Sequence, residues 1–170
     1  MFYSPKQDKK AIITSIVVII LSVLIVSLSG LFPGWSGVIN IAGMAVLTGA
    51  TFVTVRYSIY KYAYQITSTD LIVTRTAYKR TQTVAVLALS EGVGVYKRPK
   101  NAKEKSEIPD EMKKTDGRMN FCQNLFAEPY VFTTRFNGRL IEILIEADEE
   151  FARALKEASD RAREEAEDEQ

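Results

Sequence analysis

The chain of 170 residues contains no histidine, and Cys122 is its only cysteine. A disulfide framework and a metal site built from clustered His and Cys ligands are therefore excluded within one chain. Residues 119–126, around Cys122, read as a strand, which predicts a buried structural thiol because no neighbouring group would stabilise a thiolate. The sequence predicts neither a metal nor a cofactor.

Catalytic motifs are missing as well. Without histidine, a Ser or Cys nucleophile lacks its usual base, and the chain has no glycine-rich phosphate loop followed by Lys and Ser or Thr. Adjacent carboxylates occur at Asp148, Glu149 and Glu150, where helix capping or a solvated helix explains them better than acid–base catalysis. The sequence therefore predicts a protein that is not an enzyme.

Charge is absent from the 45 residues between Lys10 and Arg56. A bilayer core requires about 20 apolar helical residues, so this run predicts a transmembrane hairpin of two helices, 11–31 and 38–56, joined by a turn at 32–37. A cleaved signal peptide is the competing interpretation, but its apolar core would be shorter. No acid or base lies within the spans, which argues against a transport pathway.

The charges that flank the hairpin are all outside its turn. Lys6, Lys9 and Lys10 precede the first helix, and Arg56 and Lys61 follow the second. Positive residues that flank membrane spans are retained on the cytoplasmic side. Residues 1–10 and the residues after 56 are therefore predicted to be cytoplasmic, with two spans in the cell membrane between them.

Net charge is divided unevenly along the remainder. Residues 56–141 hold 15 Lys and Arg against 8 Asp and Glu, a net charge of +7, whereas residues 142–170 hold 4 against 12, a net charge of −8. A basic body with an acidic end suits a domain held against an anionic leaflet, and solvated faces are the alternative. Nucleic-acid binding is not predicted, because the basic segment lacks interleaved aromatic residues. The cations predicted to contact anionic lipid are Arg56, Lys61, Arg75, Lys79, Arg80, Lys97, Arg98, Lys100 and Lys103.

Short apolar runs separated by turn residues predict a β-rich domain over residues 57–158. The runs cover residues 62–67, 71–76, 81–87, 93–97, 118–126, 130–136 and 139–145. Asn137-Gly138 is a strong hairpin signal, because both central residues of a type I′ turn require positive φ. Residues 99–117 are rich in lysine and poor in large apolar side chains, which predicts a long, mobile, basic loop.

A C-terminal amphipathic helix follows the last strand. Asp148 is placed as its N-cap, and Phe151, Ala154, Leu155 and Ala158 recur at helical spacing on one face. Residues 159–170 add only alanines to that face and are predicted to form an acidic, solvated helical tail.

Seven strands and one helix after a membrane anchor give an order that resembles the bacterial pleckstrin-homology-like (PH-like) family of small membrane proteins. The residues that carry the resemblance are Tyr64, Ile66, Thr67, Leu71 and Arg75 at the spacing Y-x-I-T-x-x-x-L-x-x-x-R, with segments 83–87 and 145–151. The resemblance implies a membrane-anchored α+β protein, in which a seven-stranded antiparallel PH-like barrel is capped by the C-terminal helix. The turn Ser68-Thr69-Asp70 lacks the cations that phosphoinositide-binding relatives place there, so phosphoinositide recognition is not expected.

Two binding functions follow from these features. In one, the domain is a membrane-anchored interaction module that holds a protein or peptide partner at a sheet edge or beside the terminal helix. In the other, the hairpin packs into a larger membrane complex or a homo-oligomer as an accessory or immunity-like subunit. Ala45 and Gly49 are the small residues predicted to permit close helix packing, either with another subunit or between the two helices of the hairpin.

Overall fold

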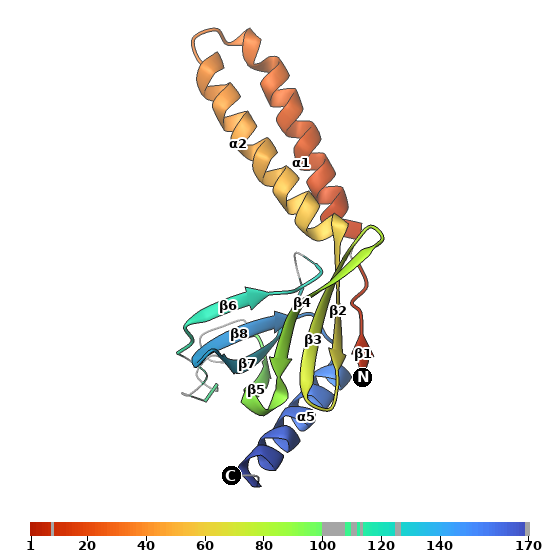
Figure 1. Cartoon of the computed structure of the whole chain (residues 1–170). Coiled ribbons are helices and arrows are strands. Elements are labelled where there is room, and N and C mark those ends of the chain that lie inside the picture. Colours follow the sequence, from red (N-terminus) through yellow and green to blue (C-terminus); the bar gives the residue numbers. More distant parts are fainter. Residues whose placement is uncertain (8, 100–107, 110–111, 113, 125–126, 169–170) are drawn as a thin grey trace. The chain divides into compact units, whose positions relative to one another are not determined.

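The computed structural model describes residues 1–7, 9–99, 108–109, 112, 114–124 and 127–168. The chain divides into two compact units (Figure 1): Gln7–Lys61, which we call the hairpin unit, and Met1–Lys6 with Tyr62–Gln170, which we call the β-domain. The first six residues thus belong to the β-domain, although the sequence assigned residues 1–10 to a separate segment. Most of the predicted loop 99–117 lies outside the described residues.

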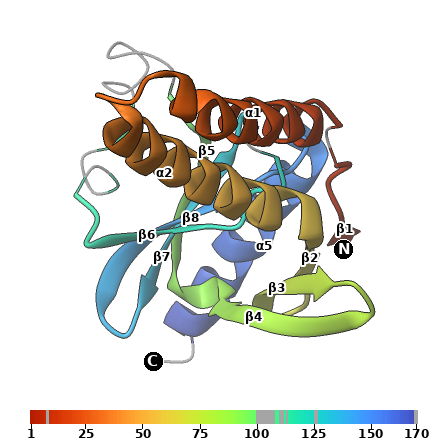
Figure 2. The ribbon, with the colours of Figure 1, turned by 90° about the horizontal axis from the view of Figure 1, so that it is seen from above.

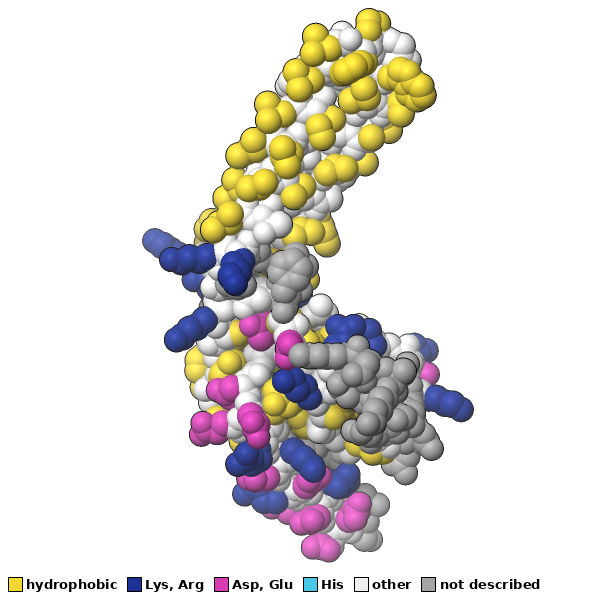
Figure 3. Space-filling view, turned by 180° about the vertical axis from the view of Figure 1, so that it is seen from behind, with side chains coloured by type: hydrophobic (Ala, Val, Ile, Leu, Met, Phe, Trp, Pro, Cys, Tyr) yellow, Lys and Arg dark blue, Asp and Glu magenta, His cyan; other side chains and the backbone are white. Residues whose placement is uncertain are grey.

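The hairpin unit consists of two long helices. α1 (Lys9–Leu28) is followed by a 3-10 turn, η1 (Ser29–Leu31), and α2 (Ser36–Thr54) ends in a π-helical turn, η2 (Val55–Ile59). Ile12–Leu31 and Ser36–Tyr57 are long and apolar enough to cross a membrane. Hydrophobic side chains cover the face of the helices seen in Figure 3. The two helices predicted from the charge-free run are therefore present, with bounds within a few residues of those expected.

The contact between α1 and α2 uses a glycine. A Cβ at Gly43 would collide with the side chain of Val26, so the helices approach each other where Gly43 has no side chain. Ser22 is buried in α1, and its hydroxyl donates to the carbonyl oxygen of Val18 at 2.7 Å. Ala45 lies two residues from Gly43, about 200° around the helix, and both it and Gly49 are exposed. Gly43 is thus buried against α1, whereas the predicted pair Ala45 and Gly49 is exposed.

The first sheet of the β-domain contains the strands β1 (Phe2–Tyr3), β2 (Tyr60–Ile66), β3 (Asp70–Ala77) and β4 (Arg80–Ala88), in that order. The β2 side chains alternate, so that Tyr62, Tyr64 and Ile66 are buried while their neighbours are more exposed. β1 adds an edge strand, with Tyr3 opposite Tyr64. The strands predicted at 62–67, 71–76 and 81–87 correspond to β2, β3 and β4.

The second sheet contains β5 (Gly92–Lys97), β6 (Gly117–Asn120), β7 (Tyr130–Phe136) and β8 (Arg139–Ile145), in the order β5-β7-β8-β6. The predicted turn is confirmed, since Asn137 and Gly138 adopt φ values of 51° and 75° between β7 and β8. A 3-10 turn, η3 (Leu89–Glu91), connects the sheets.

Two features of the second sheet differ from the prediction. β6 pairs in parallel with β8, so the strands are not all antiparallel. The strand expected over residues 118–126 ends at Asn120, because its Oδ1 accepts a hydrogen bond from the Cys122 amide at 2.9 Å and turns the chain. Across the described residues there are eight strands in two separate sheets rather than seven in one closed barrel. Cys122 is buried, as predicted.

The core of the β-domain is completed by α5 (Glu149–Asp168), which lies between the strands of the two sheets in Figure 2. Asp148 is its N-cap, since its Oδ1 accepts the Phe151 amide at 2.8 Å. Phe151 and Leu155 are fully buried, as predicted. Ala152 and Ser159 complete the buried face, whereas Ala154 and Ala158 lie at its margin.

Candidate functional site

The outer edge of β4 carries backbone groups that point away from the sheet. The Leu89 amide donates to the Thr69 carbonyl oxygen at 2.8 Å, and Asp70 stands opposite Ala88. In an antiparallel ladder this bond makes Asp70 and Ala88 a non-hydrogen-bonded pair. Hydrogen-bonded and non-hydrogen-bonded pairs alternate along the ladder, so Ile72 and Val86 form the next non-hydrogen-bonded pair. The amide and carbonyl groups of Val86 and the amide of Ala88 therefore point outward, away from β3, at the edge of the sheet. The Ala88 carbonyl is instead at the N-cap of the 3-10 turn η3, where it accepts the first bond of that turn.

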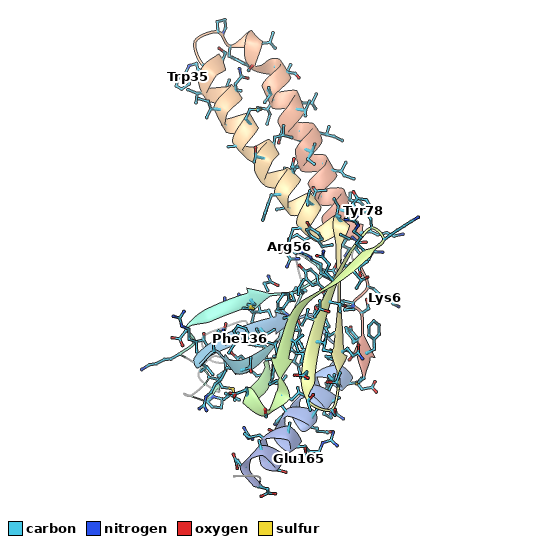
Figure 4. The ribbon with its side chains drawn as sticks, in the orientation of Figure 1. Lys6, Trp35, Arg56, Tyr78, Phe136 and Glu165 are labelled. Atoms are coloured by element: carbon cyan, nitrogen blue, oxygen red, sulfur yellow. The ribbon has the colours of Figure 1, made fainter. Side chains whose placement is uncertain are left out.

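A groove of about 430 Å³ lies beside this edge. Its exposed large apolar residues are Val86 and Phe136, with 51% and 41% of their surfaces exposed. Figure 4 labels Phe136, the last residue of β7. The residues that line the groove are Asp70, Val86, Leu87, Ala88, Glu91, Arg135, Phe136, Asn137 and Gly138. The groove is thus formed by the end of β4, the turn η3 and the β7–β8 turn, which are far apart in sequence.

The charges of the groove are two acids and one base. Asp70 and Glu91 supply carboxylates, and Arg135 supplies a guanidinium. The Thr69 hydroxyl donates to Asp70 Oδ2 at 2.7 Å and orients that carboxylate. A cationic side chain of a ligand would find two carboxylates here, next to an apolar surface.

Several contacts fix η3 and so hold the end of β4 in place. The Thr134 hydroxyl donates to the Glu91 carbonyl oxygen at 3.1 Å, and the Ser159 hydroxyl donates to the Leu89 carbonyl oxygen at 2.9 Å. A Cβ at Gly92 would collide with Ser159 and lie 2.8 Å from the ring of Phe132. The edge of β4 is therefore supported by α5 and β7 and is preorganised for pairing.

A second cavity, of about 280 Å³, lies on the second sheet and is lined in part by Tyr96, Arg98, Arg118 and Glu142. Arg118 Nε contacts Glu142 Oε2 at 2.6 Å, and the Tyr96 hydroxyl donates to Glu142 Oε1 at 3.4 Å. Burial, with the negative charge of Glu142, raises the pKa of Tyr96. The polar groups of this cavity are therefore largely engaged with one another.

Within the β-domain, the predicted lipid-contact cations that the structure describes lie on both sheets. Arg75, Lys79 and Arg80 belong to β3, the β3–β4 turn and the start of β4. On the second sheet, Lys97 pairs with Glu128 at 3.2 Å and Arg98 lines the second cavity. The others are divided between the hairpin unit, which contains Arg56 and Lys61, and the region outside the described residues, which contains Lys100 and Lys103. Arg56 lies 5.3 Å from the centroid of the Tyr57 ring.

Sequence reasoning missed the groove and the exposed Tyr78 in the β3–β4 turn. Val86 and Phe136 come from runs correctly predicted as strands, but their exposure depends on which strand forms the sheet edge. Within the described residues, no group of three His, Cys, Asp or Glu side chains could hold a metal ion.

Comparison of the chain with models of known families, with curated proteins and with solved structures found no match.

Proposed function

We propose that this chain is a non-enzymatic, membrane-anchored PH-like interaction module, which binds an extended segment of a partner protein at the outer edge of β4. The observation that carries the proposal is the pair of outward backbone positions, Val86 and Ala88, beside the groove. An added strand would satisfy these groups through main-chain hydrogen bonds, while its side chains enter the groove. The order of two sheets followed by α5 supports the PH-like assignment.

In this proposal the hairpin is the anchor, with both of its ends on the cytoplasmic side. The excess of Lys and Arg outside the turn supports this orientation. That both ends lie on the same side has independent support, because β1 precedes α1 and β2 follows α2, yet the two strands pair in one sheet. Chain segments that pair in one sheet must be on the same side of a membrane.

The groove favours a partner segment of stated chemistry. An aliphatic or aromatic side chain would pack against Val86 and Phe136, and a neighbouring Lys or Arg would face Asp70 and Glu91. Alternate side chains of an extended peptide point to the same face, so these two residues are expected to be two positions apart.

The test is selection of short random peptides on the full-length protein in lipid nanodiscs, followed by affinity measurement on edge variants. Val86→Pro removes the outward amide and leaves the β3–β4 ladder intact, so it should weaken binding about tenfold. Val86→Ala is the matched control, because it keeps the amide and removes only apolar contact. If selected peptides bind Val86→Pro as tightly as the unmodified protein, pairing at this edge is wrong.

A second candidate function places the working surface on the hairpin, as an accessory or immunity-like subunit of a larger membrane complex. The outward exposure of Ala45 and Gly49 supports it, because Gly43 already serves the contact between α1 and α2. Gly49→Leu should then abolish recovery of the complex from native membranes in mild detergent, while Val86→Pro should leave it unchanged. If Val86→Pro abolishes recovery of the complex and Gly49→Leu leaves it unchanged, the result supports the interaction module that binds at β4.

A further inference from the structure

The turn between β3 and β4 presents an aromatic side chain to solvent. Tyr78 is 85% exposed, the largest fraction among the exposed large hydrophobic residues of the described chain. Its φ of 55° lies in the left-handed region, where Gly, Asn or Asp is the usual occupant of a two-residue turn. A tyrosine held in this conformation, without burial, indicates a role outside the fold.

The pairing of β2 with β3 places this turn at one end of the first sheet. The Thr67 amide donates to the Asp70 carbonyl oxygen at 2.9 Å, and the Thr74 hydroxyl reaches the Ala63 carbonyl oxygen at 3.3 Å. Carried along the strands, the same register sets Ala77 opposite Tyr60, the first residue of β2. The turn therefore projects beyond the end of the sheet at which the chain arrives from the apolar helices.

The charge of the turn is positive throughout. Lys79 and Arg80 follow Tyr78 directly and are exposed, and Arg75 lies on the last part of β3. No Asp or Glu occurs between Asp70 and Glu91 in the sequence. An amphipathic aromatic ring flanked by cations is the combination that favours the interface of an anionic bilayer.

We propose that Tyr78, Lys79 and Arg80 form a contact site for the anionic surface of the membrane in which the hairpin is anchored. Tyr78 inserts its ring among the headgroups, and the two cations pair with lipid phosphates. This inference rests on the membrane anchoring of the proposed function, but not on peptide binding at β4.

The contact would orient the groove. Val86 and Ala88 lie six and eight residues along β4 from Arg80, which at about 3.3 Å per residue places the groove roughly 20–25 Å from the turn. With the turn on the membrane, the partner-binding edge would be held toward the cytosol, accessible to a partner. Figure 4 labels Tyr78 at the β3–β4 turn and Phe136 apart from it, beside β7 and β8.

The test uses the full-length protein in nanodiscs of phosphatidylcholine and phosphatidylglycerol, with brominated acyl chains as fluorescence quenchers. Trp35, in the hairpin turn, is the only tryptophan and reports insertion of the hairpin in the unmodified chain. Tyr78→Trp in a Trp35→Phe background reports the site. Phe136→Trp in the same background is the matched control, because Phe136 lines the groove away from the turn.

The expected result is quenching of the Tyr78→Trp variant in anionic nanodiscs, weaker in pure phosphatidylcholine and at high salt, with little quenching of the Phe136→Trp variant. Adding Lys79→Gln or Arg80→Gln should lower the ratio of docked to undocked protein about fivefold each. If the two tryptophan variants are quenched equally little while Trp35 is quenched in the unmodified chain, the contact site is wrong and the anchor stands. If Trp35 is not quenched either, the anchor itself is wrong.

A protein partner for the same turn is the remaining outcome. The Tyr78→Trp variant would then be unquenched in nanodiscs of either composition, and its emission would shift only when another protein is added. That result overturns the lipid contact.

Discussion

The ring of Tyr3 stacks on the ring of Tyr64, with centroids 6.4 Å apart and planes inclined by 10°. Tyr3 also lies 5.5 Å from the ring of Phe151, so a residue that precedes the apolar helices contacts strand β2 and helix α5 together. The Asn124 side-chain amide adds a second link by donating to the Lys6 carbonyl oxygen at 2.8 Å. The segment ahead of α1 is therefore a structural part of the β-domain.

Loss of the Tyr3 ring should destabilise the β-domain. Tyr3→Ala removes two aromatic contacts of about 0.5–1.5 kcal/mol each, so the free energy of unfolding should fall by about 1–3 kcal/mol. Urea unfolding of the full-length protein in detergent, followed by near-ultraviolet circular dichroism, measures this change. Phe2→Ala is the control, because Phe2 is 66% exposed and should cost little. Equal stability of both variants would show that the Tyr3 ring does not contribute to the free energy of unfolding.

Phe151 should be among the most sensitive positions in α5. Phe151→Ala leaves a cavity at a fully buried site and should lower the free energy of unfolding by about 3–5 kcal/mol. Truncation after Arg163 removes mainly exposed turns and should cost less than about 0.5 kcal/mol. Both are best measured on the full-length chain, since a fragment starting at residue 57 lacks β1. A Phe151→Ala protein that unfolds like the unmodified one would mean that α5 is not docked.

Local patterns predicted most of the secondary structure. The charge-free run predicted two helices, short apolar runs separated by turn residues predicted β2, β3 and β4, and Asn137-Gly138 predicted the β7–β8 turn. These signals are local, because each depends on residues close together in sequence. β1 has only two residues and shows no periodicity, so no local pattern predicts it.

The remaining differences depend on long-range contacts. The parallel pairing of β6 with β8, and the end of β6 at Asn120, follow from tertiary structure and one side-chain hydrogen bond. Gly43 and Gly49 are equally small, and only the rotation of α2 decides which of them meets α1. The cations were found by composition, but their division between two sheets and the groove beside β4 required the three-dimensional structure.

The topology of the hairpin can be tested by cysteine labelling in intact cells. Ser36→Cys in a Cys122→Ser background should react with an impermeant maleimide, because the charge-free turn is expected outside the cell. Ser4→Cys in the same background should react only after the cells are opened. Labelling of the Ser4 variant in intact cells would reverse the assignment, and labelling of both would indicate leaky cells rather than either orientation.

Tyr64 should make the β-domain sensitive to alkali. Burial raises the pKa of its hydroxyl above the ordinary value of 10.0. In the folded state the hydroxyl donates to the Phe121 carbonyl oxygen at 2.7 Å and accepts the Glu146 amide at 3.2 Å. The unfolded chain releases this proton near pH 10, and the folded chain releases it only at higher pH. The contribution of the protonated Tyr64 hydroxyl to the free energy of unfolding is therefore complete below pH 10 and is lost as the pH rises above it.

Tyr64→Phe should therefore change stability in two ways. Near pH 7, it should lower the free energy of unfolding by about 1–3 kcal/mol, because the Phe121 carbonyl and the Glu146 amide lose their partner. Above about pH 10, the free energy of unfolding of the variant should fall less steeply with pH than that of the unmodified protein, by up to about 1.4 kcal/mol per pH unit. Urea midpoints across this range measure both effects, with Tyr78→Phe as the exposed control. If the alkaline decline keeps its full slope in Tyr64→Phe, another group causes it, and Tyr96, whose pKa is also raised by burial, is the next residue to replace.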